Sequence, residues 1–223
     1  MSRAVRGSPR LLSAALCVLV TSCGGEAEEA GASPGSGDAP APGTVEGTAP
    51  PATGGIPSVA LLDPEGAAAT PVPAEAEVMD QYGMAFGPRL LVVRPGQPVE
   101  FTNSEDIDHA VRVRSVDADS TLFNVATPPG ASHEHAFERA GGYAVSCDVH
   151  PGMKAFILVV REPYAAVPDD RGAFSFADVP EGSYTLSLWN LDPTLRSERR
   201  VVVGPEGGLL EPDGRQPPHG GGP

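Results

Sequence analysis

Basic residues, aromatic residues and long apolar runs are all scarce in this sequence of 223 residues. It contains 15 Lys and Arg against 29 Asp and Glu, which gives a net charge of −14. That balance excludes nucleic acid as a partner and a polybasic patch on a membrane, because both need clustered cations. No apolar run reaches the roughly 20 residues that span a bilayer. No nucleotide-binding loop or paired-carboxylate pattern stands out, although the length of the chain does not exclude an enzyme.

Glycine and proline, by contrast, are abundant. The chain holds 27 Gly and 25 Pro, whereas aromatic residues make up only 5%. We therefore expect one modest folded core of about 100–150 residues with unstructured flanks. Residues 23–55 are predicted to be a disordered tether rich in Gly, Pro and acidic residues, and residues 204–223 a disordered tail.

The first 22 residues have the pattern of a secretory signal. Three Arg residues precede the apolar stretch from Leu11 to Val20, and small residues follow it. The exit sequence Val20-Thr-Ser-Cys23-Gly resembles the bacterial lipobox, in which the Cys is lipidated. An ordinary signal peptide that contains a Cys is the alternative. The pattern predicts lipidation at Cys23 and a place in the bacterial cell envelope, on the periplasmic or cell-surface side. The lipid anchor would be the only contact with the membrane.

Three cysteines leave one thiol without a partner. Cys17 lies inside the signal and Cys23 would be acylated, so Cys147 has no intramolecular disulfide partner. An unpaired thiol in an exported protein is either buried and inert, bonded to another chain, or bound to a metal. Its neighbours in the sequence have to decide between these three roles.

Those neighbours indicate a metal site. Cys147, His150 and Met153 follow one another with two residues between each pair, and His109 lies far upstream. Two His and one Cys in a trigonal array, with a weak axial Met, are the ligands of blue-copper electron-transfer sites. We therefore predict one type 1 copper ion. A buried Cys with unrelated neighbours is one alternative, and zinc is another, although a thioether is a poor fourth ligand for zinc.

The phase of two expected strands supports this prediction. Cys147 shares a strand face with Val145, and both residues point to the apolar side. His109 shares a face with Val111 and Val113 in the same way. We expect the site where these two strands meet, at one end of a β-sandwich.

Residues 75–161 resemble a cupredoxin of the plastocyanin/amicyanin type, on the framework Met79, Gln81, Phe86-Gly-Pro88, Gly96, Phe101, Asn103, Phe137, Gly142 and Tyr143. The resemblance implies an all-β, two-sheet Greek-key sandwich, assigned here to residues 56–161, that carries single electrons. It also implies His109, Cys147 and His150 as the strong ligands and Met153 as the axial one. The sequence departs from many relatives at Ala110, where they have Asn.

Two further histidines lie upstream of the ligand loop. His133 and His135 are two residues apart and would share one face of a strand. They form either a second metal site or partly exposed residues of an edge strand.

A second β module is expected in residues 162–203. Apolar residues alternate with small or polar ones in two stretches separated by turn signals, at Phe174, Phe176, Tyr184, Leu186 and Leu188. This hairpin pattern resembles part of a carboxypeptidase regulatory-like β-sandwich, a resemblance that implies no peptidase activity. About 40 residues are too few for an independent sandwich. The missing strands come from residues 56–62, or the hairpin docks on the cupredoxin sheet.

The sequence leaves three functions open. The first is a type 1 copper protein that carries single electrons. The second is copper storage or delivery without redox cycling, and the third is a surface β-sandwich binding module with a vestigial copper loop. For the first, we expect a monomer that exchanges electrons with redox partner proteins and is not an enzyme, because four ligands leave no open position for a substrate. Residues 56–161 carry 14 acidic and 7 basic residues, a balance that either steers a partner of basic character or serves solubility alone.

Overall fold

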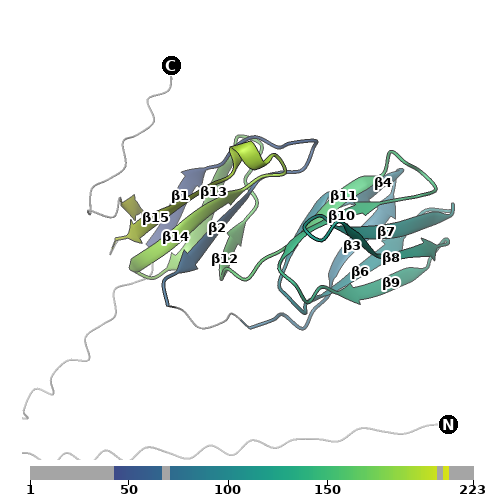
Figure 1. Ribbon diagram of the computed structural model, residues 1–223, viewed down its shortest axis with the longest axis horizontal. Helices are drawn as coiled ribbons and strands as arrows, with labels where there is room; N and C mark the ends of the chain where they lie inside the picture. Colours follow the sequence, from purple (N-terminus) through teal and green to yellow (C-terminus); the bar gives the residue numbers. More distant parts are fainter. Residues whose placement is uncertain (1–42, 67–70, 205–207, 211–223) are drawn as a thin grey trace, which may run out of the picture. The chain divides into compact units, whose positions relative to one another are not determined.

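The computed structural model describes residues 43–66, 71–204 and 208–210, in which β-strands dominate (Figure 1). The strands form four sheets, and one short 3₁₀ helix, η1 (Pro193–Leu195), interrupts them. Within these ranges, no helix is long and apolar enough to cross a membrane. The predicted all-β fold class is confirmed. The predicted signal, Cys23 and most of the predicted tether lie outside the described residues.

Two of the sheets form a sandwich around the predicted cupredoxin core. One sheet has the order β5-β11-β10-β7-β8, and the other has the order β4-β3-β6-β9. Along β6, buried residues alternate with partly exposed ones, as expected for a strand with one face in a core. The largest side chains of the core include Met79, Phe86, Phe101 and Phe137, which are at most 1% exposed. The strands are β3 (Glu77–Tyr82), β4 (Ala85–Gly87), β5 (Leu90–Val93), β6 (Pro98–Asn103), β7 (His109–Ser115), β8 (Ser120–Thr127), β9 (Ser132–Ala136), β10 (Gly141–Ser146) and β11 (Lys154–Val159).

The other two sheets form a second module. The predicted hairpin of residues 162–203 is wrong, because its two strands, β13 and β14, lie in different sheets. Its main sheet has the order β12-β2-β14-β15-β16, and β1 pairs with β13 in a smaller sheet. Strand β2 pairs with β14, where Leu62 lies opposite Leu186, so the segment around residues 56–62 does supply a missing strand. In sequence, the first sandwich is therefore inserted between β2 and β12. The strands are β1 (Gly43–Thr48), β2 (Val59–Pro64), β12 (Tyr164–Ala166), β13 (Ala173–Val179), β14 (Gly182–Trp189), β15 (Ser197–Val203) and β16 (Leu209–Leu210).

Three predicted boundaries are corrected by these strands. The tether was expected to extend to residue 55, but β1 pairs with β13 and buries Val45 completely. Gly47 in β1 serves close packing, because a Cβ there would lie 2.5 Å from Cζ of Phe174. The predicted tail contains β16, which pairs with β15. The predicted cupredoxin boundary at residue 56 is wrong as well, because residues 59–64 pair within the second module.

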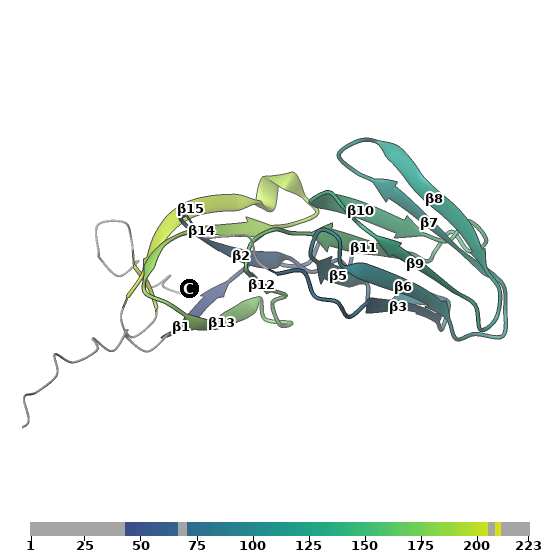
Figure 2. The same cartoon turned by 90° about the horizontal axis from the view of Figure 1, so that it is seen from below.

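Strand β2 is buried on both faces. Ala60 and Leu62 lie in the core of the second module, whereas Val59 and Leu61 pack in a separate cluster with residues such as Phe156 of β11. A strand buried on both sides is expected to be continuously apolar, as residues 59–62 are. Figure 2 shows β2 between β12 and β14, in agreement with the pairing.

Candidate metal centre

The candidate metal centre forms where two antiparallel strands, β7 and β10, meet at one end. His109 is the first residue of β7, and Cys147 directly follows β10. Both side chains point into the core, with 1% and 2% exposure. His150 lies in the loop that connects β10 to β11 and is partly exposed. The alternation of each strand thus places two of the predicted ligands inside, as the sequence predicted.

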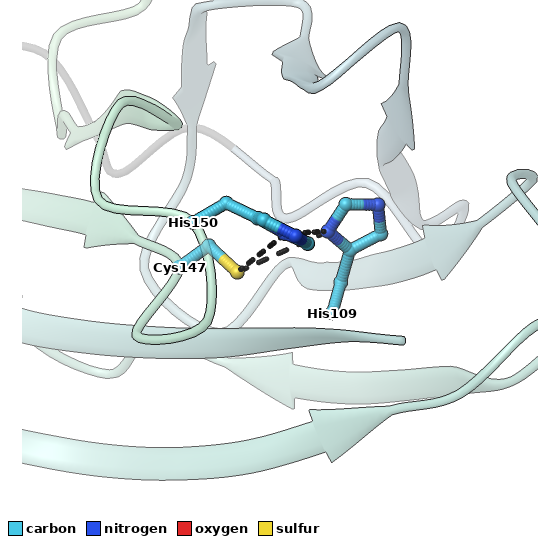
Figure 3. Close-up of side chains that lie close together, drawn as sticks. All are labelled: His109, Cys147 and His150. Carbon is cyan, nitrogen blue, oxygen red and sulfur yellow. Dashed lines mark hydrogen bonds between the residues drawn. The ribbon is translucent and has the colours of Figure 1, made fainter. Parts of the chain in front are cut away.

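Three ligand atoms converge at this point (Figure 3). Nδ1 of His109 and Nδ1 of His150 are 3.0 Å apart, and each is 3.9 Å from Sγ of Cys147. Imidazole nitrogen and thiolate sulfur are both common metal ligands, and atoms this close together could bind the same ion. His109, Cys147 and His150 are therefore the residues that would hold a metal here.

Glu105 orients the ring of His109. One of its carboxylate oxygens lies 2.7 Å from Nε2 of His109, and the carboxylate also accepts hydrogen bonds from the backbone N–H groups of Gly83 and Met84. Burial alone would raise the pKa of Glu105, but the hydrogen bonds from His109, Met84 and Gly83 outweigh it and lower that pKa below its usual value. An ionised carboxylate accepts the proton on Nε2, which leaves the lone pair of Nδ1 free for a metal.

Sequence reasoning did not find Glu105. The only signal for it is an acidic residue four positions before His109, and that signal is weak because Asp106 and Asp108 lie in the same loop. The loop conformation depends on Asn103, whose side chain donates to the carbonyls of Ile107 and Thr127 and accepts from the N–H of Glu105. Asn103 thereby turns the chain so that Glu105 reaches His109.

Cys147 makes two further hydrogen bonds, one through its sulfur and one through its backbone N–H. The N–H of Ala110 donates to Sγ at 3.3 Å, and the N–H of Cys147 donates to the carbonyl of Met153 at 3.3 Å. Among the residues that the structure describes, Cys147 is a free cysteine.

Met153 lies at the end of the same loop and is 1% exposed, in the same core cluster as Cys147. Its N–H donates to the carbonyl of His150 at 2.9 Å, which closes the loop on itself. The axial role of Met153 stays a prediction, as do the roles of the three other ligands.

His133 and His135 do not join the centre. Both lie on β9 and pack against Phe123 of β8, with ring centroids 4.8 Å from it. Burial, followed by the neighbouring His133, lowers the pKa of His135. Among the described residues, the cluster capable of holding a metal consists of His109, Cys147 and His150 alone.

The comparisons with known proteins agree with this site. The model of the copper-binding proteins of the plastocyanin/azurin family matches residues 73–160, which include all four predicted ligands. None of the curated proteins matches the chain.

Solved structures that resemble the chain include three copper proteins. A purple cupredoxin from Nitrosopumilus maritimus is 23% identical, over 38% of this chain and 99% of its own, with a TM-score of 0.34. Amicyanin from Paracoccus versutus is 20% identical, over 44% of this chain and 97% of its own, with a TM-score of 0.36. A copper-containing nitrite reductase from Thermus scotoductus is 24% identical, over 46% of this chain but only 26% of its own, with a TM-score of 0.37. The family model thus covers the segment that holds the side-chain cluster, and the cluster of His109, Cys147 and His150 is compatible with a copper site.

Proposed function

We propose that this protein is a type 1 copper protein that carries single electrons in the bacterial cell envelope. The observation that carries the proposal is the convergence of one thiol and two imidazole nitrogens within 3.9 Å of one another, next to a buried Met. Soft sulfur ligands combined with imidazole suit copper, and a closed set of four ligands leaves no position for a substrate. The protein would therefore transfer electrons without catalysing a reaction.

Each residue of the centre has a distinct task in this proposal. Copper, when bound, would supply a one-electron couple between its two oxidation states. Cys147 and His109 are buried and keep water out, while Glu105 fixes the tautomer of His109. His150 is partly exposed, in contrast to the buried His109 and Cys147, and would be the residue through which an electron leaves the protein.

Partner docking is proposed at the same end of the sandwich. Exposed apolar side chains lie directly next to the centre: Val149 precedes His150 and is 52% exposed, and Ile107 is 42% exposed. The acidic residues Asp106, Asp108 and Asp148 flank them. A partner with an apolar contact surface and a basic rim suits this surface, and acidic charge would speed its approach at low salt. We propose that the protein acts as a monomer in such encounters.

The location in the envelope rests on the sequence pattern around Cys23, which lies outside the described residues. Expression of the full chain in a bacterial host should place it in the membrane fraction. The Cys23→Ser variant, with the same signal otherwise, should move to the soluble envelope fraction. An unchanged membrane fraction for that variant would contradict lipid anchoring.

Electrochemistry separates the three functions. A carrier loaded with copper should give a reversible one-electron couple and exchange electrons rapidly with a redox partner. A storage or delivery protein would lose Cu(I) rapidly to a chelator and show no reversible couple. A binding module with a vestigial loop would bind its partner equally well after Cys147→Ser. Either of the last two results would replace the proposed function.

A further inference from the structure

The ligand loop, residues 147–153, has an anchor outside the proposed ligand set. Oδ2 of Asp148 accepts a hydrogen bond from Nδ2 of Asn124 at 2.7 Å, and Oδ1 accepts one from Arg112 at 3.4 Å. Arg112 and Asn124 lie directly opposite each other in the β7–β8 ladder. Two neighbouring strands therefore hold one carboxylate of the loop, directly after Cys147.

The neighbourhood of this anchor shows why the loop needs it. A hollow lies between the start of β7 and the ligand loop, lined in part by Ala110, Ala126, Asp148 and Val149. The methyl groups of the two alanines form no hydrogen bonds, so the side chain of residue 110 does not tie the loop to β7. Between the strands β7 and β8 and the ligand loop, the described hydrogen bonds outside the imidazole rings include the one from the N–H of Ala110 to Sγ of Cys147 and the two that Asp148 accepts.

We propose that Asp148, held by Asn124 and Arg112, is a positioning residue that fixes the ligand loop, and that its charge favours the oxidised ion. The first half concerns the protein without metal. The second half rests on the proposed copper function, because a negative charge one residue from Cys147 and two from His150 stabilises the more highly charged oxidation state.

The ion pair between Arg112 and Asp148 is suited to fixing the ligand loop without affecting the rest of the fold. The side chains of Arg112 and Asp148 are 43% and 44% exposed, and a pair this exposed adds little to overall stability. Substitutions at Asp148 or Asn124 should therefore leave the fold intact and change the loop.

Asp119 offers a matched control. It pairs with Arg114, which lies on β7 two residues after Arg112, but it is far along the strand from the ligand loop. Its backbone has φ of 49°, a conformation that Asn tolerates well. Asp119→Asn thus removes one negative charge and one ion pair with an arginine of β7, as Asp148→Asn does, but leaves the ligand loop unchanged.

The first arm of the test uses metal-free protein. The amides of Cys147 and Met153, whose hydrogen bonds close the loop, should exchange with solvent about fivefold faster in Asn124→Ala and Asp148→Ala, since each variant loses a hydrogen bond to a charged group. Asp119→Asn should exchange at the wild-type rate. Unchanged rates in both loop variants would overturn the positioning role.

The second arm uses copper-loaded protein. Asp148→Asn keeps an oxygen that can accept from Asn124 but loses the charge. The ratio of Cu(II) to Cu(I) affinity should fall about threefold, which raises the reduction potential by about 30 mV. A shift no larger than that of Asp119→Asn would overturn the electrostatic half. If copper does not bind at all, the proposed function fails, whereas the exchange measurement still decides whether Asp148 positions the loop.

Discussion

Cys147 combines three properties that are rarely found together in one side chain. It is 2% exposed, it accepts a hydrogen bond from the N–H of Ala110, and its sulfur lies 3.9 Å from two imidazole nitrogens. A buried cysteine without such neighbours is inert, whereas two imidazole nitrogens beside the sulfur allow the three atoms to share one metal ion. At the scale of single residues, the chemistry of the site therefore depends on this one sulfur.

Replacing that sulfur tests its role. Cys147→Ser keeps the size and the hydrogen bond but removes the soft ligand, so the intense copper–thiolate absorption should disappear. Copper affinity should fall by more than the roughly 10–100-fold that the loss of an outer hydrogen-bond partner costs. Absorption spectra and metal titrations measure both effects. Ser146→Ala, one residue away, is the control and should keep the colour; a coloured Cys147→Ser protein would contradict the assignment.

The sequence allowed the ligands to be predicted but not their supports. His109, Cys147, His150 and Met153 show themselves by residue type and spacing, and the two-residue period of a strand tells which side chains point inward. Glu105 and Asp148 act through contacts made by turns and neighbouring strands. Such contacts have no spacing rule, so an acidic residue in a polar loop cannot be distinguished from a solvated one by sequence alone.

At the scale of elements, β1 shows where composition misleads. It lies within residues 23–55, which are rich in Gly and Pro and were predicted to be a disordered tether, yet β1 pairs with β13. The reason is that Gly47 leaves room for the ring of Phe174, while Val45 fills the core. By contrast, β13 and β14 were predicted correctly as strands because their apolar residues alternate strictly. Their pairing as a hairpin was wrong, because alternation shows which face of a strand is buried but not which strand lies beside it.

A substitution in β1 tests its packing. Gly47→Ala should lower the free energy of unfolding by about 1–3 kcal/mol, because the added methyl overlaps the ring of Phe174. Denaturant unfolding measures the change. The exposed Glu46 on the same strand provides the control, and Glu46→Ala should stay within about 0.5 kcal/mol of the wild type. Equal stabilities for the two variants would mean that β1 is not packed as described.

The short helix η1 gives a pH-dependent prediction. Asp192 precedes it and accepts hydrogen bonds from the N–H and hydroxyl of Thr194, which lower the pKa of Asp192. A lowered pKa means that the carboxylate adds stability above its unfolded pKa and loses it as pH falls through the folded pKa. The wild type should therefore have a higher free energy of unfolding than Asp192→Ala at pH 7. The difference between the two proteins should shrink below about pH 4. Thermal unfolding across this pH range measures the difference. A stability difference that grows toward low pH would contradict the prediction.

At the scale of the whole described chain, β2 connects two hydrophobic clusters. Ala60 and Leu62 belong to the core of the second module, and Leu61 packs in the cluster that contains Phe156 and Leu158 of β11. The single Trp of the sequence, Trp189, stacks on Phe156 with ring centroids 5.1 Å apart. The outward-facing apolar side chains of β11 are thus covered by residues of β2 and by Trp189.

This coupling predicts joint unfolding. Trp189 fluorescence and the copper absorption should change in one transition on denaturation of the wild type. Leu61→Ala, at a position only 7% exposed, should lower stability by about 2–4 kcal/mol and separate the two signals. Two separate transitions in the wild type would show that the modules fold independently.

The most direct test of the account is a copper titration of the purified protein followed by visible absorption. We expect an intense charge-transfer band that saturates at one copper per chain and is absent with zinc. A protein that stays colourless with copper, yet binds zinc tightly, would contradict the assignment of His109, Cys147, His150 and Met153 to a type 1 copper site.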